Sequence, residues 1–265
     1  MSGKDFSGWT VVVTGASTGL GRAIAVETAD RGAALVVINY ASSADEAAET
    51  ARLVEGHGAR AITVQGDVSS GDDCRKIVAV VDTGRIDALF NNAGMTKFAN
   101  HADLDALSAE DFLRLYSVNV VGAFQMVRAA RALLEAAPQP GAVVMTASIA
   151  AVMGIGSSIA YAASKGALTT MTLSLARALA PKIRVNAICP GYIDTPWFGR
   201  NMDAQGLERL RQNVAASSPL KVASNPEDIA AAAIFLASSA SRHVTGETLI
   251  VDAGTHLGYA PMRMA

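Results

Sequence analysis

The chain has 265 residues, 51% of them hydrophobic and 17% charged, and its 22 Lys and Arg against 24 Asp and Glu leave a formal net charge of −2. This balance implies neither a nucleic-acid partner nor an anionic membrane partner. The first residues contain no apolar stretch of signal-peptide length, and no apolar run reaches the ~18 residues of a membrane span. We therefore expect a soluble cytoplasmic protein.

Short β-branched runs alternate along the chain with longer segments of helical spacing. The runs lie at Thr10–Val13, Leu35–Ile38, Ala61–Val64, Ala88–Phe90, Ala142–Thr146, Ile183–Ile188 and Thr248–Val251. Their continuous apolar character suits strands buried on both faces of a parallel sheet. One helical segment, residues 108–134, begins with Ser108 and Asp111 at the spacing of a helix-start cap. The pattern predicts one α/β domain, residues 1–265, built on a Rossmann-type doubly wound parallel sheet of about seven strands with helices on both faces.

One long stretch, from Gly191 to about Ala216, shows no clear helix or strand pattern. It contains the large apolar residues Trp197, Phe198 and Met202. Long loops of this kind are usually functional lids or disordered. We therefore predict a substrate lid around residues 191–216.

The first strand leads into a glycine-rich turn. Thr14-Gly15-Ala16-Ser17-Thr18-Gly19-Leu20-Gly21 follows the strand and opens a helix that ends near Gly32. Glycines at such a turn let a pyrophosphate approach backbone N–H groups at the positive end of a helix. An ordinary glycine-rich turn is the alternative, and the position in the first β–α unit favours dinucleotide binding.

The stretch from Ser148 to Lys165 carries the candidate chemistry. Tyr161 and Lys165 are four residues apart, so a helix places them on one face. An ammonium group favours a neighbouring phenolate, and a drop of about two to three pKa units would let Tyr161 exchange protons near pH 7. The alternative is a surface helix whose lysine reaches into solvent. Ser148 follows a predicted strand, at the sheet edge where α/β proteins bind ligands, and this favours a site.

The chain contains two cysteines. Cys74 and Cys189 lie far apart, and neither shows metal-ligand spacing with any of the four histidines. We interpret both as reduced packing residues and predict no metal site.

Several motifs occur together in an order typical of one family. They are Thr14-Gly15-x-x-x-Gly19-x-Gly21, Asn91-Asn92-Ala93-Gly94, Asn119, Ser148, Tyr161-x-x-x-Lys165 and Pro190-Gly191-x-x-x-Thr195. From Gly8 to about Gly254 the chain resembles the short-chain dehydrogenase/reductase family. Asn39-Tyr40 and the late run Thr245-Gly246-Glu247-Thr248-Leu249-Ile250-Val251-Asp252-Ala253-Gly254 are most similar to its 3-oxoacyl-carrier-protein-reductase-like branch.

The resemblance implies a hydride transfer between a nicotinamide cofactor and a carbonyl carbon. It implies that Ser148 donates a hydrogen bond to the carbonyl oxygen and that Tyr161 exchanges the proton. Lys165 would lower the pKa of Tyr161 and bind the nicotinamide ribose, while Asn119 would hold a water near Lys165. We therefore predict a carbonyl reductase or alcohol dehydrogenase. The alternatives are a 3-oxoacyl-carrier-protein reductase and, in another class, a non-catalytic dinucleotide-sensing protein.

The resemblance also implies a set of cofactor contacts. Asp67 would accept a hydrogen bond from the adenine amine beside Val68, and Thr195 would bond the carboxamide. The full set is Gly15, Ser17, Thr18, Gly19, Leu20, Gly21, Asn39, Tyr40, Ser42, Asp67, Val68, Asn92, Ala93, Gly94, Tyr161, Lys165, Pro190, Gly191, Ile193 and Thr195. On residue chemistry alone, Asp67 and Thr195 are equally turn residues, the Asn pair is equally a local turn, and Asn119 is equally a packing partner.

The end of the second strand bears on the choice of cofactor. Dinucleotide-binding sheets that prefer NAD usually place Asp or Glu there, but here no carboxylate appears before Asp45. Asn39, Ser42 and Ser43 offer a 2′-phosphate neutral donors, from side chains or backbone, whereas Thr18 stands where many NADP enzymes of the family place Arg or Lys. We predict NADP(H), with NAD(H) possible, and expect Asn39→Asp to shift the preference toward NAD(H).

Apolar residues dominate the candidate substrate pocket. They are Met95, Phe98, Ile149, Met153, Ile155, Tyr192, Trp197, Phe198 and Met202. Since few charges are present, we expect a small uncharged or partly apolar ketone or secondary alcohol as the partner, although several of these residues are equally suited to pack the lid. Arg128, Arg131 and Arg177 are available to a carrier protein.

The segments 120–124 and 167–176 carry more apolar residues than one buried face needs, so we predict a homo-oligomer, a tetramer by resemblance, with the tail from His256 available to reach a neighbour.

Overall fold

The structure is a computed structural model, and it describes residues 5–199 and 202–258. Within that part of the chain, parallel strands form one seven-stranded sheet in the order β3-β2-β1-β4-β5-β6-β7. The strands are β1 (Thr10–Val13), β2 (Leu35–Tyr40), β3 (Arg60–Gln65), β4 (Ala88–Asn91), β5 (Gly141–Thr146), β6 (Ile183–Pro190) and β7 (Thr248–Val251). The predicted Rossmann-type doubly wound sheet is confirmed, and each predicted strand is present with ends shifted by two residues at most.

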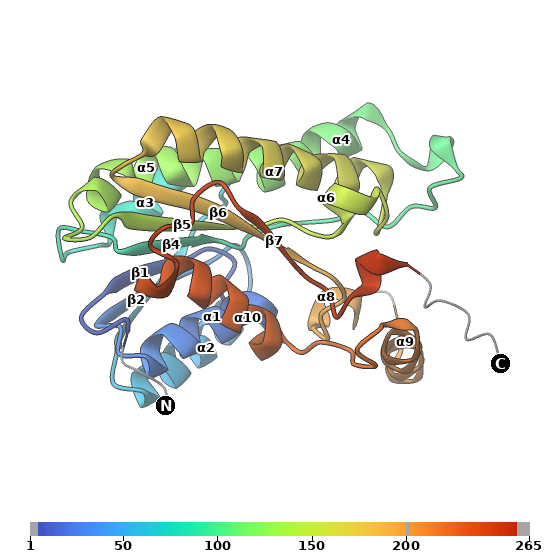
Figure 1. The fold of residues 1–265 in the computed structure, drawn as a ribbon, viewed down its shortest axis with the longest axis horizontal. Helices are drawn as coiled ribbons and strands as arrows, with labels where there is room; N and C mark the ends of the chain where they lie inside the picture. The colour runs from blue at the N-terminus through green and yellow to red at the C-terminus, as the bar shows by residue number, and fades with distance from the viewer. Residues whose placement is uncertain (1–4, 200–201, 259–265) are drawn as a thin grey trace.

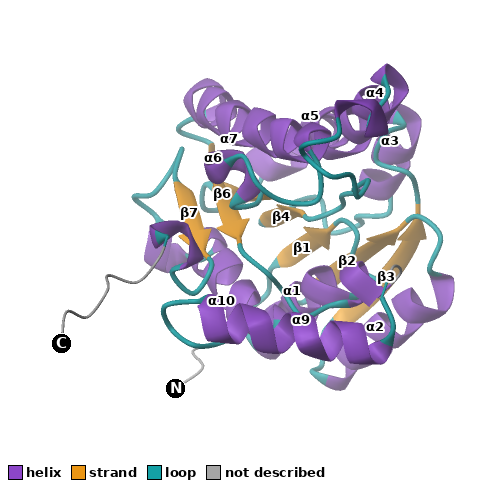
Figure 2. Cartoon of the chain, turned by 90° about the vertical axis from the view of Figure 1, so that its right-hand side faces the viewer, coloured by secondary structure: helices purple, strands orange, loops and turns teal. Residues whose placement is uncertain are grey.

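Helices cover both faces of this sheet (Figure 1), because every parallel connection must cross one face or the other. They are α1 (Gly19–Asp30), α2 (Ala44–Gly56), α3 (Gly71–Ala79), α4 (Ala109–Tyr116), α5 (Ala123–Glu135), α6 (Ala150–Met153), α7 (Ile159–Leu179), α8 (Pro196–Gly199), α9 (Ala204–Ser217) and α10 (Pro226–Ala237). In Figures 1 and 2, α4, α5 and α7 lie above the sheet, and α1, α2 and α10 lie below it.

The strand residues divide between two hydrophobic cores with the alternation that a pleated strand imposes. Val11 and Val13 pack with the α1 and α10 side of the sheet. Val12, between them, packs with the α3, α5 and α7 side. The strands therefore read as continuous apolar runs because both of their faces are buried.

Helix starts follow the capping chemistry of the sequence. Ser108 and Asp111 form a complete capping box at α4, as predicted. A second capping box, of Asn225 and Asp228, starts α10, with Pro226 at its first position. These side chains satisfy N–H groups that have no partner inside the helix, and so they fix where α4 and α10 begin.

The expectation that residues 191–216 lack regular structure is wrong. The segment contains α8 and most of α9, and the Asp203 side chain caps α9 by accepting a hydrogen bond from Gly206 N at 2.7 Å. None of the described residues of α9 is buried. A helix without a buried face shows little of the apolar periodicity by which helices are recognised in a sequence.

The sheet also determines where a ligand can bind. The strand order reverses between β1 and β4, so the connections that follow these strands leave toward opposite sides. Such a switch point opens a crevice at the carboxyl ends of the strands. Gly15 after β1 meets the loop after β4 here, and a Cβ on Gly15 would lie 2.8 Å from Ala93 Cα.

Candidate active site

The glycine-rich turn after β1 is built for close backbone approach. A Cβ on Gly21 would lie 2.3 Å from the Gly15 carbonyl oxygen, so only glycine fits there. Gly15 itself has φ +60, a conformation that side chains disfavour. The residue before α1, Thr18, makes no side-chain cap bond, so the first N–H groups of α1 are left for another acceptor. These features fit the pyrophosphate of a dinucleotide.

Asn92 and Thr14 hold this turn against β4. The Thr14 hydroxyl accepts hydrogen bonds from Asn92 N and Ala93 N, each at 3.0 Å. The Asn92 side-chain amide donates to the carbonyl oxygens of Thr14 at 3.2 Å and Gly15 at 3.0 Å. Asn92 therefore holds the glycine-rich turn in place, and its side-chain amide already donates to two backbone carbonyl oxygens.

Asn39 has a different place from the one predicted. Its side chain is 1% exposed and lies under the glycine-rich turn, where Oδ1 accepts from Gly15 N at 3.3 Å and Nδ2 donates to the Gly66 carbonyl oxygen at 3.0 Å. The Asn39 side chain is therefore not available to a 2′-phosphate, and of the donors predicted at this residue only the backbone remains. The partly exposed end of β2 is Tyr40, and Ser42 just beyond it is exposed.

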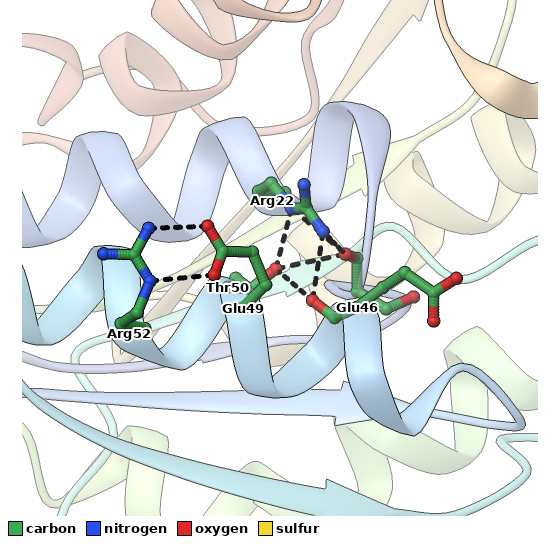
Figure 3. Close-up of polar contacts among 6 residues, drawn as sticks. Arg22, Glu46, Glu49, Thr50 and Arg52 are labelled. Carbon is green, nitrogen blue, oxygen red and sulfur yellow. Dashed lines mark hydrogen bonds and ion pairs between the residues drawn. The ribbon is translucent and has the colours of Figure 1, made fainter.

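Arg22 spans the gap between α1 and α2. Its guanidinium donates to the Ser17 carbonyl oxygen at 2.7 Å, to the Thr50 hydroxyl at 2.9 Å and to the Glu46 carbonyl oxygen at 3.0 Å. Figure 3 shows these contacts with Thr50 and Glu46 on α2. Arg22 thus tightens the glycine-rich turn through Ser17, a role that the sequence left open.

Asp67 and Val68 follow β3. The exposed Asp67 carboxylate accepts from Ser69 N at 2.9 Å, which is a local turn contact that leaves its second oxygen available. Val68 is 5% exposed and packs where Gly122 leaves room, since a Cβ on Gly122 would lie 2.8 Å from Val68 Cγ2. Val68 is therefore mainly a core residue, and Asp67 is the group that faces outward.

The three candidate catalytic side chains meet at the carboxyl ends of β4 and β5. Ser148 lies near enough to the Tyr161 phenol to lower its pKa. The Lys165 ammonium lies 5.6 Å from the centre of the Tyr161 ring and donates to the Thr146 carbonyl oxygen at 2.7 Å. Gly94 lies beside it, since a Cβ there would be 3.6 Å from Lys165 Nζ. The Ser148 and Tyr161 hydroxyls and the buried Lys165 ammonium thus lie in a single site.

The protonation of this site differs from the prediction. Burial raises the pKa of Tyr161 to about 12, and the nearby Ser148 side chain offsets this only in part. Burial lowers the pKa of Lys165 to about 8. The expected drop of the Tyr161 pKa is therefore wrong for the chain alone, because desolvation disfavours both charged forms. Tyr161 is a neutral phenol near pH 7, which is the form that donates a proton.

Asn119 lies in a π-helical segment, Ser117–Gly122, between α4 and α5. Its side chain accepts from Met95 N at 2.8 Å and donates to the Met95 carbonyl oxygen at 3.0 Å and to the Ser164 hydroxyl at 2.9 Å. A Cβ on Gly94 would lie 3.3 Å from Asn119 Oδ1, beside Lys165. π-helical insertions occur frequently at functional sites, and this one joins the loop after β4 to α7.

The segment after β6 covers the glycine-rich turn. Gly191 packs against Asp252, and a Cβ on Gly191 would lie 2.8 Å from Asp252 Cβ. Thr195 reaches the turn itself, because its Cγ2 lies 3.2 Å from the position of a Cβ on Gly19. Ile193 pairs with Ser224 in an isolated bridge. Of the predicted residues in this segment, Thr195 is therefore the one that contacts the turn.

One residue of the site, Ser164, was not recognised in the sequence. It joins Asn119 to α7 and donates to the Tyr161 carbonyl oxygen at 2.7 Å. A mid-helix serine carries no motif, so only its position reveals it. Cys189 on β6 is fully buried in the hydrophobic core, which agrees with the packing role expected for it. Within residues 5–199 and 202–258 there is no group of three or more His, Cys, Asp or Glu that could hold a metal ion, and no helix long and apolar enough to cross a membrane.

Comparison with known proteins agrees with this geometry. The family model described as enoyl-(acyl carrier protein) reductase matches residues 15–256. A Streptomyces violaceoruber protein named as ketoacyl reductase 2 of the granaticin polyketide synthase is 38% identical over 248 residues, or 93% of this chain and 95% of that protein. L-rhamnose 1-dehydrogenase (NAD(P)(+)) of Sphingomonas sp. (strain SKA58) is 38% identical over 257 residues, or 96% and 98%. A solved short-chain dehydrogenase/reductase from Brucella melitensis, titled glucose/ribitol dehydrogenase, has a TM-score of 0.82 at 34% identity and covers 94% of this chain and 97% of its own.

The chain therefore belongs to the short-chain dehydrogenase/reductase family, as its motifs indicated. It is an NAD(P)-dependent oxidoreductase that interconverts a carbonyl group and an alcohol. The alternative of a non-catalytic sensor is set aside by these relatives, which are named as reductases and dehydrogenases. Which nicotinamide cofactor and which substrate it uses are separate questions.

Proposed function

We propose that the protein is a carbonyl reductase or secondary-alcohol dehydrogenase in which Ser148, Tyr161 and Lys165 form the catalytic group. The observation that carries the proposal is that Ser148 lies near the neutral Tyr161 phenol, with the Lys165 ammonium 5.6 Å from the Tyr161 ring centre. A hydrogen-bond donor beside a proton donor is what an oxygen gaining negative charge requires.

In the direction of reduction, a nicotinamide cofactor held at the glycine-rich turn would supply a hydride to the carbonyl carbon. The electron pair of the C=O bond moves to oxygen, where Ser148 donates a hydrogen bond. Tyr161 then gives its proton to that oxygen, and the alcohol forms. Lys165 stabilises the phenolate that remains, and Asn119 positions the surrounding backbone through Met95 and Ser164. Oxidation runs the same proton transfer in reverse.

The first test is Tyr161→Phe, which removes the proton donor and keeps the ring. We expect turnover to fall by about 10²–10⁴-fold, the usual contribution of general acid catalysis. Nicotinamide absorbance against a panel of ketones and alcohols measures it. A variant that keeps more than about a tenth of the wild-type turnover would show that Tyr161 is not the acid.

We propose NADP(H) as the preferred cofactor, with modest discrimination against NAD(H). No carboxylate stands at the end of β2 before Asp45, so a 2′-phosphate meets no repulsion there. Tyr40 and Ser42 line this end, and Thr18 adds no positive charge. Arg22 already donates to Ser17, Thr50 and Glu46, so a strong charge-assisted contact is not expected from it.

A carrier-protein substrate is the second candidate. It is favoured by the family model, whose description names an acyl carrier protein, and by the ketoacyl reductase among the relatives. Arg128, Arg131 and Arg177 are the available basic residues. Activity on a 3-oxoacyl thioester far above that on simple ketones would favour this candidate.

We also propose a homotetramer and a mobile lid over the site, formed by residues 191–216. Exposed apolar residues gather on the helices above the sheet and support an interface: Leu113, Val121, Phe124 and Leu173. The part of the tail from residue 259 onward, which the sequence offers as a crossing segment, lies outside the described residues. The cytoplasmic location stays a prediction.

A further inference from the structure

Trp197 on α8 lies beside the proton donor. Its ring centre is 6.4 Å from that of Tyr161, and the two planes are tilted by 55°. The backbone N–H of Trp197 donates to the Thr195 hydroxyl at 3.4 Å, which ties α8 to the segment after β6. Trp197 nevertheless remains 37% exposed. An exposed aromatic surface therefore lies beside the Tyr161 ring.

The segment after α6 lies against the same tyrosine and presents apolar side chains. A Cβ on Gly156 would lie 3.6 Å from Tyr161 Cδ1, so this backbone borders the ring. The neighbouring Met153 and Ile155 are 37% and 41% exposed. Phe98, 42% exposed, belongs to a loop held to this segment by the hydrogen bond from Ala99 N to the Ser157 carbonyl oxygen at 2.8 Å.

Polar groups at this rim are already paired with one another. The hydroxyls of Thr96 and Ser157 share a hydrogen bond, and His101 Nε2 lies 3.2 Å from the Gly156 carbonyl oxygen. Lys97 forms an ion pair with Asp111 at 2.5 Å. These pairs use part of the hydrogen-bonding capacity of the rim, while Met153, Ile155 and Phe98 supply its exposed apolar surface.

We propose that Trp197 is the specificity-determining residue of this enzyme and selects ketones that carry a flat aromatic group beside the carbonyl. The inference rests on the proposed function, since it requires the carbonyl oxygen at Ser148 and Tyr161. Trp197, next to Tyr161, can then meet an aromatic substituent on that carbonyl carbon edge to face, an arrangement in which aromatic rings attract each other. A saturated ring of the same size buries similar area but lacks this interaction.

The test compares acetophenone with cyclohexyl methyl ketone, which have the same carbon skeleton and differ in the flatness of one ring. With NADPH, we expect the wild type to reduce acetophenone with a kcat/KM about five- to tenfold higher. Trp197→Leu should abolish this preference, while Trp197→Phe should keep most of it. Phe235→Leu, which changes an exposed aromatic residue on α10, is the matched control and should alter neither substrate.

Binding can be followed without turnover. The chain has two tryptophans, so Trp9→Phe leaves Trp197 as the sole indole. Acetophenone should then quench the fluorescence of Trp197 saturably, and cyclohexyl methyl ketone should not. The proposal is overturned if wild-type enzyme shows no preference for acetophenone, or if Trp197→Leu keeps the preference. When both ketones are reduced equally in a Tyr161-dependent way, the proposed function survives and only this inference fails.

Discussion

The charged Lys165 side chain is buried, and burial disfavours its charge. The side chain is 3% exposed, and burial lowers its pKa from 10.5 to about 8. Between these two values the unfolded chain binds more protons than the folded one, so the contribution of Lys165 to stability improves as the pH rises through that window. Near pH 7 both states are protonated, and the folded protein bears the full desolvation cost.

Lys165→Met should therefore make the protein more stable while removing its activity. We expect the free energy of unfolding at pH 7 to rise by about 1–2 kcal/mol, since relief of the buried charge exceeds the lost hydrogen bond to Thr146. Urea denaturation at pH 7 and pH 10 measures it, and the gain should be smaller at pH 10. Lys182→Met, an exposed lysine, is the control. A Lys165→Met protein less stable than wild type would contradict the assignment.

Cofactor preference should respond to Tyr40 and not to Asn39. Tyr40→Asp places a carboxylate at the partly exposed end of β2, and like-charge repulsion should shift the ratio of kcat/KM for NADPH over NADH about tenfold toward NADH. Asn39→Asp instead removes the donor to the Gly66 carbonyl oxygen and buries an anion, so it should cost about 2–4 kcal/mol of stability. Steady-state kinetics and thermal unfolding separate the two effects. A shift of preference in Asn39→Asp at unchanged stability would refute the placement of Asn39.

The Asn39-Tyr40 motif alone could not show which of the two side chains faces the cofactor. Strand alternation puts Asn39 and Tyr40 on opposite faces, but nothing in the sequence says which face meets the cofactor. That depends on how the turn after β1 folds back over β2, where Gly15 N meets Asn39 Oδ1. The direction of the Lys165 pKa shift was equally hard to predict. The sequence gives the spacing of two residues on a helix, but it does not give how deeply they are buried.

At the scale of elements, Arg184 on β6 caps the C-terminal end of α10. Although 8% exposed, its guanidinium donates to the carbonyl oxygens of Leu236 at 3.0 Å and Ala237 at 2.8 Å. It also bonds Ser241 and the Val244 carbonyl oxygen, each at 3.1 Å. Helices leave their last carbonyl groups without partners, and here one cation satisfies several of them.

Arg184→Met should consequently loosen α10 from the sheet. The substitution leaves buried carbonyl groups unpaired, and we expect a loss of about 2–4 kcal/mol. Chemical denaturation measures the loss, and amide hydrogen exchange should locate it in α10. Arg177→Met, which removes an exposed arginine from α7, should have little effect. Equal stability of the two variants would show that the capping contacts contribute nothing.

The elements were predictable to different degrees for physical reasons. Strands buried on both faces leave long apolar runs, and the Ser108 cap marks the start of α4 in the sequence itself. In contrast, α9 buries none of its described residues and leaves no apolar stripe. The π-helical segment at Ser117–Gly122 depends on packing around Asn119, and one polar residue in a helix does not reveal it.

For the whole molecule, the exposed apolar residues predict self-association. Leu113 is 71% exposed on α4 and Leu173 is 50% exposed on α7, and both helices lie on the same side of the sheet in Figure 1. Light scattering should give four times the 27.3 kDa chain mass at micromolar concentration. Leu173→Glu should shift the mass downward, because it buries a charge in the interface. A monomer mass for the wild type would disprove the tetramer.

The contact between Thr195 and Gly19 connects the proposed cofactor site with the proposed substrate site. Thr195 Cγ2 lies 3.2 Å from where a Cβ on Gly19 would be, and Trp197 follows two residues later against Tyr161. A cofactor that enters between the turn and Thr195 would move the short segment that also carries Trp197. Binding at one end would then change affinity at the other, and thermodynamic linkage makes that influence equal in both directions. Double-reciprocal plots at several cofactor concentrations would express it as lines that cross away from the substrate axis.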